Sequence, residues 1–298
     1  MAAESFTPTA DPVADLLAIL DLEQLEHNLY RGLSPRSAWQ RVFGGQVAAQ
    51  ALVAAQRTVP DNRFVHSLHG YFMRPGDISV PIVYEVERPR DGGSFSTRQV
   101  LAIQHGEAIF SLSASFKTDE DGLDHQVSMP EDLPDPETLP GREALMAMMG
   151  DNAPDTIRRY WARPRPFELR PVTLDHYTSR RKLAPRQDVW VRAMGPIPQD
   201  RSIQAAVLAY LSDMTLLDTA TFAHGLSVFD KDVQAASIDH AVWFHRPAPL
   251  DDWLLYSQDS PSASGARGFT RGSIFTRDGR LVASVAQEGL IRLKNRQP

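Results

Sequence analysis

Hydrophobic and polar residues alternate over long stretches in both halves of the chain, chiefly residues 94–116 and 265–289. Because alternate residues of a strand point to the same face of a sheet, this pattern predicts β-strands. Each stretch is interrupted once by a turn signal, His105-Gly106 in the first and Asp278-Gly279 in the second. A dipeptide of this type between alternating strands predicts a hairpin. Each half is therefore expected to contain an antiparallel meander.

A helical pattern of small residues precedes the strands in each half. It reads GGQVAAQALVAAQRTV over residues 44–59 and RSIQAAVLAYLSD over residues 201–213. A sheet can approach an alanine-rich helix closely, because the side chains are short. The pattern therefore predicts an α+β fold in which each helix is wrapped by an antiparallel sheet.

The order of signals is the same in the two halves, which indicates an internal repeat. An aromatic-x-Arg-Pro motif follows each helix, and its arginines, Arg74 and Arg246, are 172 residues apart. The turn glycines, Gly106 and Gly279, are 173 residues apart. Because the two intervals are nearly equal, the chain is expected to be a tandem duplication.

A segment rich in acidic residues and proline separates the repeats, EDGLDHQVSMPEDLPDPETLPG over residues 120–141. Proline restricts the backbone and removes a hydrogen-bond donor, so this segment is expected to be a linker, and its run MPEDLPDPETLP over residues 129–140 is expected to be mobile or loosely bound to the surface. The predicted organisation is a first repeat over 10–119, a linker and connecting helix over 120–164, and a second repeat over 165–298.

Composition narrows the classes of function. The 298 residues carry a net charge of -6, so the protein has no overall positive field that would favour the binding of nucleic acid. Cysteine is absent, which excludes disulfides, thiolate metal sites and a cysteine nucleophile. The start MAAESFTPTA does not resemble a secretory signal, and no apolar run is long enough to span a bilayer. A cytoplasmic location is expected.

Two polar residues interrupt otherwise apolar patterns, and both lie in the second repeat. Gln287 shares a strand face with Val285 and other apolar residues, although burying an amide without partners costs about 1–3 kcal/mol. The offset of 173 aligns Gln287 with Ala114. When the helices are aligned, Asp213 falls at the position of Ala55. These substitutions make Gln287 and Asp213 candidates for chemistry rather than for packing.

Four stretches, FGGQVAAQAL, HSLHGYFMRPG, DHAVWFHRP and ASVAQEG, resemble those of the acyl-CoA thioesterase II family. The resemblance extends from about Leu20 to Leu293. It implies a double hot-dog fold, hydrolysis of acyl-CoA to a free acid and coenzyme A, and no cofactor. It also implies a homo-oligomer that assembles through its sheets.

The resemblance also implies a catalytic set. In that family an Asp, a Thr or Ser, and a Gln position the hydrolytic water, and the matching residues here are Asp213, Ser237 and Gln287. Serine replaces the threonine that is common in the family, but the hydroxyl is retained. A carboxylate that accepts a proton from an oriented water would act as a general base.

Four further residues are candidates for binding the substrate. Gly45 belongs to a glycine-led helix start whose N–H groups could bind a developing oxyanion. His66 is placed opposite Ser237 by comparison of the repeats. Arg267 and Arg271 could meet the phosphates of coenzyme A, although each could equally be an outward strand residue or an ion-pair partner. The histidines lack a carboxylate-rich surrounding, so no metal site is predicted, and His240 is expected to be a core or hydrogen-bonded residue.

Two other functions compete with hydrolysis. Hot-dog enoyl-CoA hydratases use a motif of the form D-x-N-P-x-H, but the matching stretch here is DMTLLD, with Asp218 in place of the histidine. A non-catalytic acyl-CoA-binding protein of the same fold would be expected to lack the polar set. All three of its residues are present, which favours catalysis.

Overall fold

Thirteen antiparallel strands form one continuous sheet in the computed structural model, which describes residues 6–35, 41–149 and 155–294. The strands of the first half are β1 (Glu23–Glu26), β2 (Leu29–Gly32), β3 (Phe64–Phe72), β4 (Ile82–Asp91), β5 (Phe95–Gln104) and β6 (Glu107–Lys117). Those of the second half are β7 (Phe167–Pro171), β8 (Arg186–Ala193), β9 (Val233–Ser237), β10 (Asp239–Phe244), β11 (Leu254–Ser264), β12 (Arg267–Thr276) and β13 (Leu281–Leu293).

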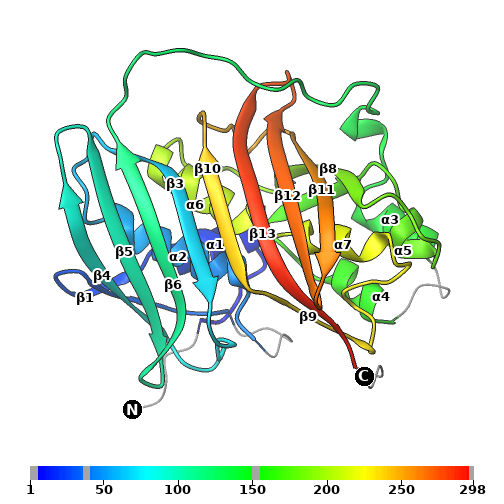
Figure 1. Cartoon of the computed structure of the whole chain (residues 1–298), viewed down its shortest axis with the longest axis horizontal. Helices are drawn as coiled ribbons and strands as arrows, with labels where there is room; N and C mark the ends of the chain where they lie inside the picture. The colour runs from blue at the N-terminus through cyan, green and yellow to red at the C-terminus, as the bar shows by residue number, and fades with distance from the viewer. Residues whose placement is uncertain (1–5, 36–40, 150–154, 295–298) are drawn as a thin grey trace.

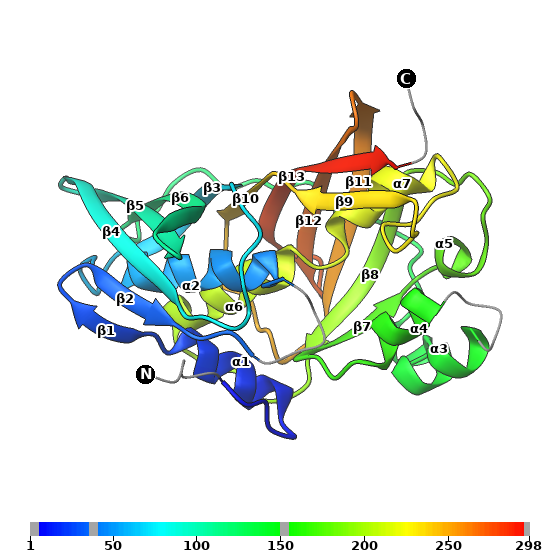
Figure 2. The same cartoon turned by 90° about the horizontal axis from the view of Figure 1, so that it is seen from below.

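The helices lie on one side of this sheet or at its ends (Figure 2). They are α1 (Pro12–Leu20), α2 (Gly44–Gln56), α3 (Arg142–Met149), α4 (Asp155–Ala162), α5 (Asp175–Thr178), α6 (Arg201–Ser212) and α7 (Thr219–Phe222). Two 3-10 turns, η1 (Pro136–Thr138) and η3 (Leu216–Asp218), complete the description. Each predicted alanine-rich helix is therefore present, as α2 and α6.

The strand order shows that the second half repeats the first. It runs β1-β2-β4-β5-β6-β3 and continues as β10-β13-β12-β11-β8-β7, while β9 pairs with β13. The two halves meet where β3 pairs with β10, with His69 opposite Ala241 and Tyr71 opposite Asp239 (Figure 1). The two predicted repeats consequently share a single sheet. The strand order of the second repeat is that of the first in reverse, with β3 and β10 at the centre.

Arg74 and Arg246 make equivalent contacts in the two repeats. The backbone N–H of Arg74 donates to Ile109 O at 3.2 Å, and that of Arg246 donates to Val282 O at 3.3 Å. Each guanidinium donates to the carbonyl of the residue before that acceptor, at 2.7 and 3.0 Å. These matched bonds confirm the offsets of 172 and 173 and give both arginines a structural role.

The two predicted hairpin turns are also present. His105 (φ 52°) and Gly106 (φ 74°) are both left-handed between β5 and β6, as a turn that follows the twist of the strands requires. Gly279 (φ 88°) takes the same region between β12 and β13. The turn residues read from the sequence therefore set the register of both hairpins.

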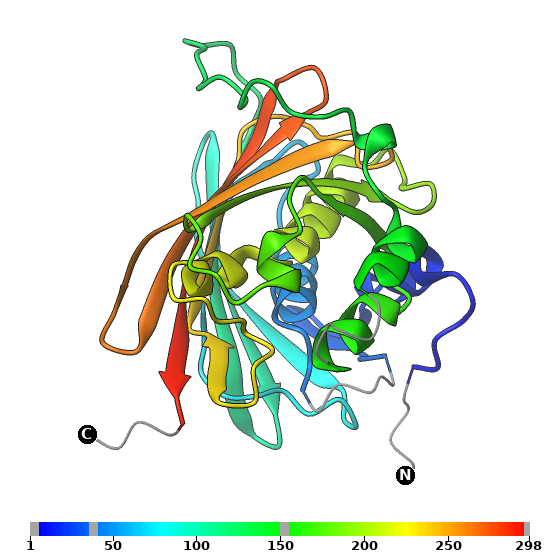
Figure 3. The same cartoon turned by 90° about the vertical axis from the view of Figure 1, so that its right-hand side faces the viewer.

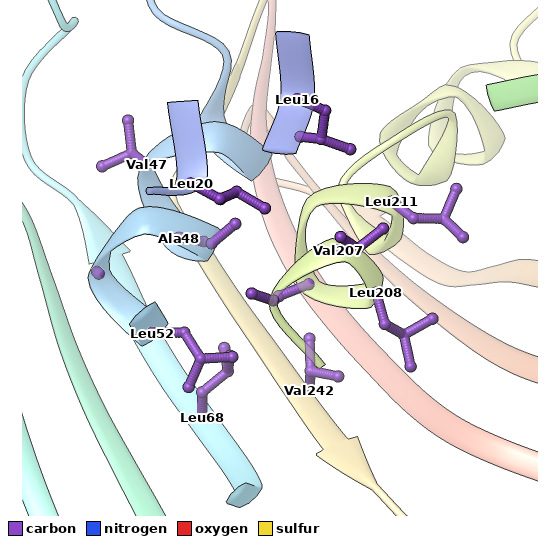
Figure 4. Packing of buried hydrophobic residues seen from close by; sticks show 14 of the residues in the cluster. Leu16, Leu20, Val47, Ala48, Leu52, Leu68, Val207, Leu208, Leu211 and Val242 are labelled. Carbon is purple, nitrogen blue, oxygen red and sulfur yellow. The ribbon is translucent and has the colours of Figure 1, made fainter. Parts of the chain in front are cut away.

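Helices α2 and α6 pack side by side, and the sheet curves around them (Figure 3). Ala48, Ala51 and Ala55 of α2 are fully buried. Larger apolar side chains fill the space between the helices, α1 and the central strands, including Leu52 and Val242 (Figure 4). Burying a leucine or valine side chain stabilises the fold by about 1.5–3 kcal/mol. The small residues of α2 let the sheet come close enough for these contacts.

The first part of the linker passes over one end of the central strands and is held at few points (Figure 1). Residues 121–128 are exposed and form neither helix nor strand. Asp124 pairs with Arg246. Gln126 Nε2 donates to Gly279 O at 2.8 Å, and its Oε1 accepts from the N–H of Leu281 at 3.0 Å. This part of the linker is therefore loosely bound.

The second part of the linker, residues 129–140, is docked, so the expectation that this run is mobile or loosely bound is wrong. Met129, Leu133 and Leu139 pack against a small buried cluster that contains Trp190 and Trp253. Trp190 Nε1 donates to a linker carbonyl at 3.1 Å. The high proline and acid content concealed these three apolar anchors. Residues 150–154 of the predicted connecting segment lie outside the described residues, and the repeat boundaries stay a prediction.

Candidate active site

Asp213 ends helix α6 as its C-cap residue and retains only partial exposure. Burial raises the pKa of this carboxyl group to about 6, and hydrogen bonds from Gln287, the N–H of Gly45 and Ser237 oppose the rise. A carboxylate with a pKa near 6 is ionised at neutral pH and is still basic enough to take a proton in a reaction. The position therefore suits a general base.

Gln287 points inward from β13, as the alternation of the strand predicted, and is 1% exposed. Its Nε2 lies 2.6 Å from Asp213 Oδ1 and 3.2 Å from Ser237 Oγ. Ser237 ends β9, which pairs with β13 so that Ser237 lies opposite Gly289. The structure thus brings Asp213, Ser237 and Gln287 together. The amide oxygen, Gln287 Oε1, is buried and has no hydrogen-bond partner among the described residues.

The first turn of α2 faces the same place from the other repeat. Asp200 caps α6 with its side chain, but Phe43 at the start of α2 supplies no side-chain acceptor. Instead, the N–H of Gly45 donates to the carboxylate of Asp213. Since the first N–H groups of a helix need acceptors, Asp213 serves as a cap for the helix of the opposite repeat. The candidate site is therefore built from both repeats.

Gly44 and Gly45 permit this close approach. A Cβ atom at Gly44 would lie 2.8 Å from Asp213 Oδ2 and 2.9 Å from a ring carbon of Phe72. A Cβ atom at Gly45 would lie 2.5 Å from the carbonyl oxygen of Tyr210. These distances are shorter than van der Waals contact, so any side chain would push the helix start away from Asp213.

The turn after Asp213 is held in an unusual conformation. Thr215 has φ 63°, in the left-handed region that β-branched residues rarely adopt. Gln258 Nε2 donates to Thr215 Oγ1 at 2.8 Å, and Gln187 Nε2 donates to Thr215 O at 3.0 Å. Both glutamines are buried. Their hydrogen bonds hold the strained residue in place and so fix where α6 ends.

A second polar pair adjoins the set. His240 on β10 is fully buried, and its Nδ1 lies 3.2 Å from Gln287 Nε2. Its Nε2 lies 2.7 Å from Ser212 Oγ. The expectation of a core or hydrogen-bonded histidine is confirmed for His240, whereas Ser212 was not predicted. The offset of 172 aligns His240 with Leu68, so a comparison of every position in the repeats would have marked it.

His66 does not lie near the set. Tyr71 lies opposite Asp239, so Ser237 lies just beyond the C-terminal end of β3. His66 is five residues before Tyr71, toward the other end of the strand. Its Nε2 lies 2.8 Å from Ser115 Oγ. The expectation that His66 lies opposite Ser237 is therefore wrong. Comparison of the repeats identifies only which positions are equivalent. Because β3 and β10 pair antiparallel, equivalent positions lie at opposite ends of this pair of strands.

Arg267 and Arg271 lie on the outer face of the sheet. Thr270 lies opposite Gln287 and shares its inner face, so the alternation of β12 turns both arginines outward. Arg267 Nε lies 3.0 Å from Glu288 Oε1. Arg271 pairs with Asp259 at 2.6 Å. Of the four predicted substrate-binding residues, only Gly45 lies beside Asp213, Ser237 and Gln287.

No group of three or more His, Asp or Glu side chains within residues 6–35, 41–149 and 155–294 is arranged to hold a metal ion. Within the same ranges, no helix is both long enough and apolar enough to cross a membrane. The chemistry available at the site is that of a carboxylate, an amide, a hydroxyl and the N–H of a helix start.

Comparison with known proteins identifies the family. The profile described as "Acyl-CoA thioesterase" matches residues 161–290, and that described as "Acyl-CoA thioesterase N-terminal domain" matches residues 34–117. "Acyl-CoA thioesterase 2" of Haemophilus influenzae is 40% identical over 283 residues, which span 95% of this chain and 99% of that protein. The chain belongs to the acyl-CoA thioesterase family.

Two further members of the acyl-CoA thioesterase family are similar over comparable lengths. "Acyl-coenzyme A thioesterase 8" of Mus musculus is 44% identical, covering 93% of this chain and 88% of that protein. The crystal structure of the acyl-CoA thioesterase II TesB2 from Mycobacterium marinum has 46% identity and a TM-score of 0.77, covering 94% of this chain and 99% of that one. These comparisons confirm the predicted family, the double hot-dog α+β fold and the class of thioester hydrolase. The individual residue roles stay predictions.

Proposed function

We propose that the chain hydrolyses acyl-CoA esters with Asp213 as the general base and with Gln287 and Ser237 as the groups that position the water. The observation that carries this proposal is the unpartnered oxygen of Gln287. Its Nε2 bonds Asp213 Oδ1 at 2.6 Å, while its buried Oε1 is left as an acceptor beside the carboxylate. A water that donates one hydrogen to each acceptor would have its lone pair directed away from both.

The reaction balances without a cofactor. The oriented water attacks the thioester carbonyl carbon as Asp213 removes its proton. The tetrahedral intermediate collapses with cleavage of the carbon–sulfur bond, and the proton held by Asp213 passes to the departing thiolate. The products are a carboxylic acid and coenzyme A, and the carboxylate is restored. No covalent bond to the enzyme forms.

The start of α2 is proposed to stabilise the negative charge that develops on the carbonyl oxygen. The N-terminal end of a helix carries a partial positive charge and free N–H groups. Gly45 places its N–H beside Asp213, so this end of the helix faces the reacting atoms. The same contact stabilises the ionised form of the base. The positive end of the helix, to which Gly45 belongs, is thereby proposed to act on both charges.

The test is a panel of acyl-CoA esters of different chain length, with the released thiol measured colorimetrically. The protein contains no cysteine and adds no background signal. Asp213→Asn should lower kcat by at least about 100-fold, the scale of losing a general base. Asp218→Asn, which removes another buried carboxyl group nearby in sequence, should leave kcat close to wild type.

Each alternative predicts a different outcome. An acyl-CoA-binding protein would bind the esters and release no thiol above the uncatalysed rate. An enoyl-CoA hydratase would consume the double bond of an enoyl-CoA ester without releasing thiol. A single turnover in ¹⁸O-water separates the base mechanism from a nucleophilic one, because label found in Asp213 itself would require an acyl-enzyme anhydride.

The proposal includes the setting of the enzyme. The absence of cysteine suits a reducing compartment such as the cytoplasm. A homo-oligomer assembled through the outer faces of the sheets is proposed as well, and light scattering of the purified chain would measure its mass. Roles for His66, Arg267 and Arg271 in binding coenzyme A remain part of the proposal, tested by the KM of each alanine variant.

A further inference from the structure

The polar residues of the site extend beyond the three in the proposed mechanism. The offsets between the repeats align four inward positions of the second repeat, Ser212, Asp213, His240 and Gln287, with Ala54, Ala55, Leu68 and Ala114 of the first. All four counterparts are apolar and at most 1% exposed. Asp213 and Gln287 have roles in the mechanism above, but Ser212 and His240 do not. The fold does not need a polar group at either position, because the first repeat does without one.

The hydrogen bonds of Ser212 fix the tautomer of His240. Ser212 Oγ donates to Ala209 O at 2.9 Å, as its single hydrogen allows. If that hydrogen goes to Ala209 O, Ser212 Oγ accepts from His240 Nε2, which lies 2.7 Å away, and the amide nitrogen 3.2 Å from His240 Nδ1 supports the same tautomer. Burial lowers the pKa of His240 to about 4, so the ring is neutral at physiological pH. A neutral ring with its hydrogen on Nε2 has an acceptor at Nδ1.

That acceptor receives a hydrogen bond from Gln287. The amide nitrogen carries two hydrogens, and its partners at hydrogen-bond distance are Asp213 Oδ1, His240 Nδ1 and Ser237 Oγ. If the two hydrogens go to Asp213 and His240, the hydroxyl of Ser237 is free to donate to Asp213. This assignment satisfies every donor in the set. It also keeps Gln287 Nε2, rather than Oε1, in contact with the carboxylate.

We propose that His240 is a positioning residue which, through an acceptor at Nδ1 fixed by Ser212, holds the amide of Gln287 in the orientation that hydrolysis requires. The inference rests on the proposed function, because the amide matters through the water it orients. Without the acceptor, the amide can rotate about its last bond and place its oxygen against Asp213. The water site and the charge of the base would both be disturbed.

The first test compares His240→Leu with His240→Asn. Leucine is the residue of the first repeat, so the variant should fold, while it removes the acceptor. We expect kcat to fall roughly tenfold to a hundredfold, the scale of a misplaced catalytic group, with KM little changed. Asparagine places an amide oxygen where Nδ1 lies and should restore most of kcat. His245→Leu is the matched control, because His245 bonds Ser284 Oγ at 2.9 Å near the far end of β10.

The pH profile separates positioning from packing. Loss of the Gln287 donor raises the pKa of Asp213, so the acid limb of kcat should move to higher pH in His240→Leu and stay in place in His240→Asn. Burial keeps the pKa of His240 at about 4 and raises that of Tyr256, which faces Ser212 from β11, well above its usual value. Asp218 has a pKa of about 7, so the profile of Asp218→Asn is measured alongside. A residue that only fills space would not shift the limb.

Nitrogen-15 NMR of histidine-labelled protein tests the tautomer directly, with His240→Asn identifying the signals. We expect hydrogen on Nε2 and none on Nδ1, and Ser212→Ala should weaken this preference. A hydrogen on Nδ1, or full kcat in His240→Leu with an unmoved acid limb, would overturn the inference. Retained activity in Asp213→Asn would instead overturn the proposed function, so the two failures are distinguishable. If His240→Leu does not fold, His240→Asn and the NMR measurement still decide.

Discussion

Gln287 Nε2 and Asp213 Oδ1 lie 2.6 Å apart although the residues are separated by 74 positions in the sequence. The contact joins the inner face of β13 to the end of α6. A hydrogen bond to an ionised carboxylate is stronger than one between neutral groups, so it favours the charged form of Asp213. Burial works in the opposite direction and dominates, which leaves the pKa of Asp213 at about 6.

The pH dependence of hydrolysis follows from this balance. If ionised Asp213 is the base, kcat should be constant above about pH 7 and fall tenfold per pH unit below about pH 6, as the carboxylate is protonated. The measurement is kcat at saturating acyl-CoA from about pH 5 to about pH 8. An acid limb centred near pH 4, the value of an unperturbed aspartate, would contradict the assignment.

The same pKa predicts a change in stability. Burial raises the folded-state pKa of Asp213 above its ordinary value, so ionisation costs the folded state more than the unfolded one. Protonated Asp213 favours the folded state over the unfolded one. This contribution to the free energy of unfolding is complete below about pH 4 and is lost as the pH rises through about 6. Asp213→Asn should therefore raise the free energy of unfolding by roughly 1–3 kcal/mol above about pH 6. In urea titrations the gain should disappear near pH 4.

Returning Gln287 to the residue of the other repeat should separate rate from fold. Gln287→Ala matches Ala114, which is 1% exposed in its own repeat, so the variant should fold. Its kcat should fall by at least about tenfold, because the water loses one of its positioning groups. Ser237→Thr keeps the hydroxyl and should be tolerated, whereas Ser237→Ala should not. Wild-type turnover in both alanine variants would show that Gln287 and Ser237 have a structural role and no role in hydrolysis.

Relieving the strain at Thr215 should stabilise the protein. Asparagine tolerates the left-handed region and retains a side-chain acceptor for Gln258, so Thr215→Asn should raise the free energy of unfolding by about 1 kcal/mol. Thr215→Ala keeps a Cβ atom in the same region and leaves Gln258 Nε2 without its partner, so it should be less stable than wild type. Equal thermal midpoints for the three proteins would show that the turn stores no strain.

A cut in the first part of the linker should leave the enzyme assembled. Leu123 and Val127 are strongly exposed, so limited thermolysin treatment should cleave beside them before it cleaves the docked residues 129–139. The β3–β10 pairing and the contact between α2 and α6 should keep the fragments together. We expect the nicked protein to elute at the original size and to retain activity. Separation of the fragments under native conditions would contradict this.

The repeat and its hairpins could be predicted because the signals are local. Alternation fixes which residues of β13 face inward, and the Asp278-Gly279 turn fixes where the strand begins. Gln287 could be singled out because a local rule, an apolar inward face, is broken there. The departures from these rules mark the candidate site, as expected where function competes with packing.

Contacts between distant segments could not be read in the same way. The cap that Asp213 gives to α2 depends on how two helices pack, and the strain at Thr215 depends on glutamines from β8 and β11. His66 was misplaced because its distance from Ser237 depends on the direction of pairing between β3 and β10. The sequence left open whether Arg267 and Arg271 point outward from the sheet, and the strand register shows that they do.

The contact between Gly45 and Asp213 occurs once in the chain although the repeat occurs twice. In a symmetric pair of identical repeats, each helix start would meet the helix end of its partner, and two equal centres would result. Here the reciprocal helix end carries Ala55, and the start of α6 is capped by its own Asp200. Calorimetric titration with a non-hydrolysable acyl-CoA analogue should therefore find one binding centre per polypeptide rather than two.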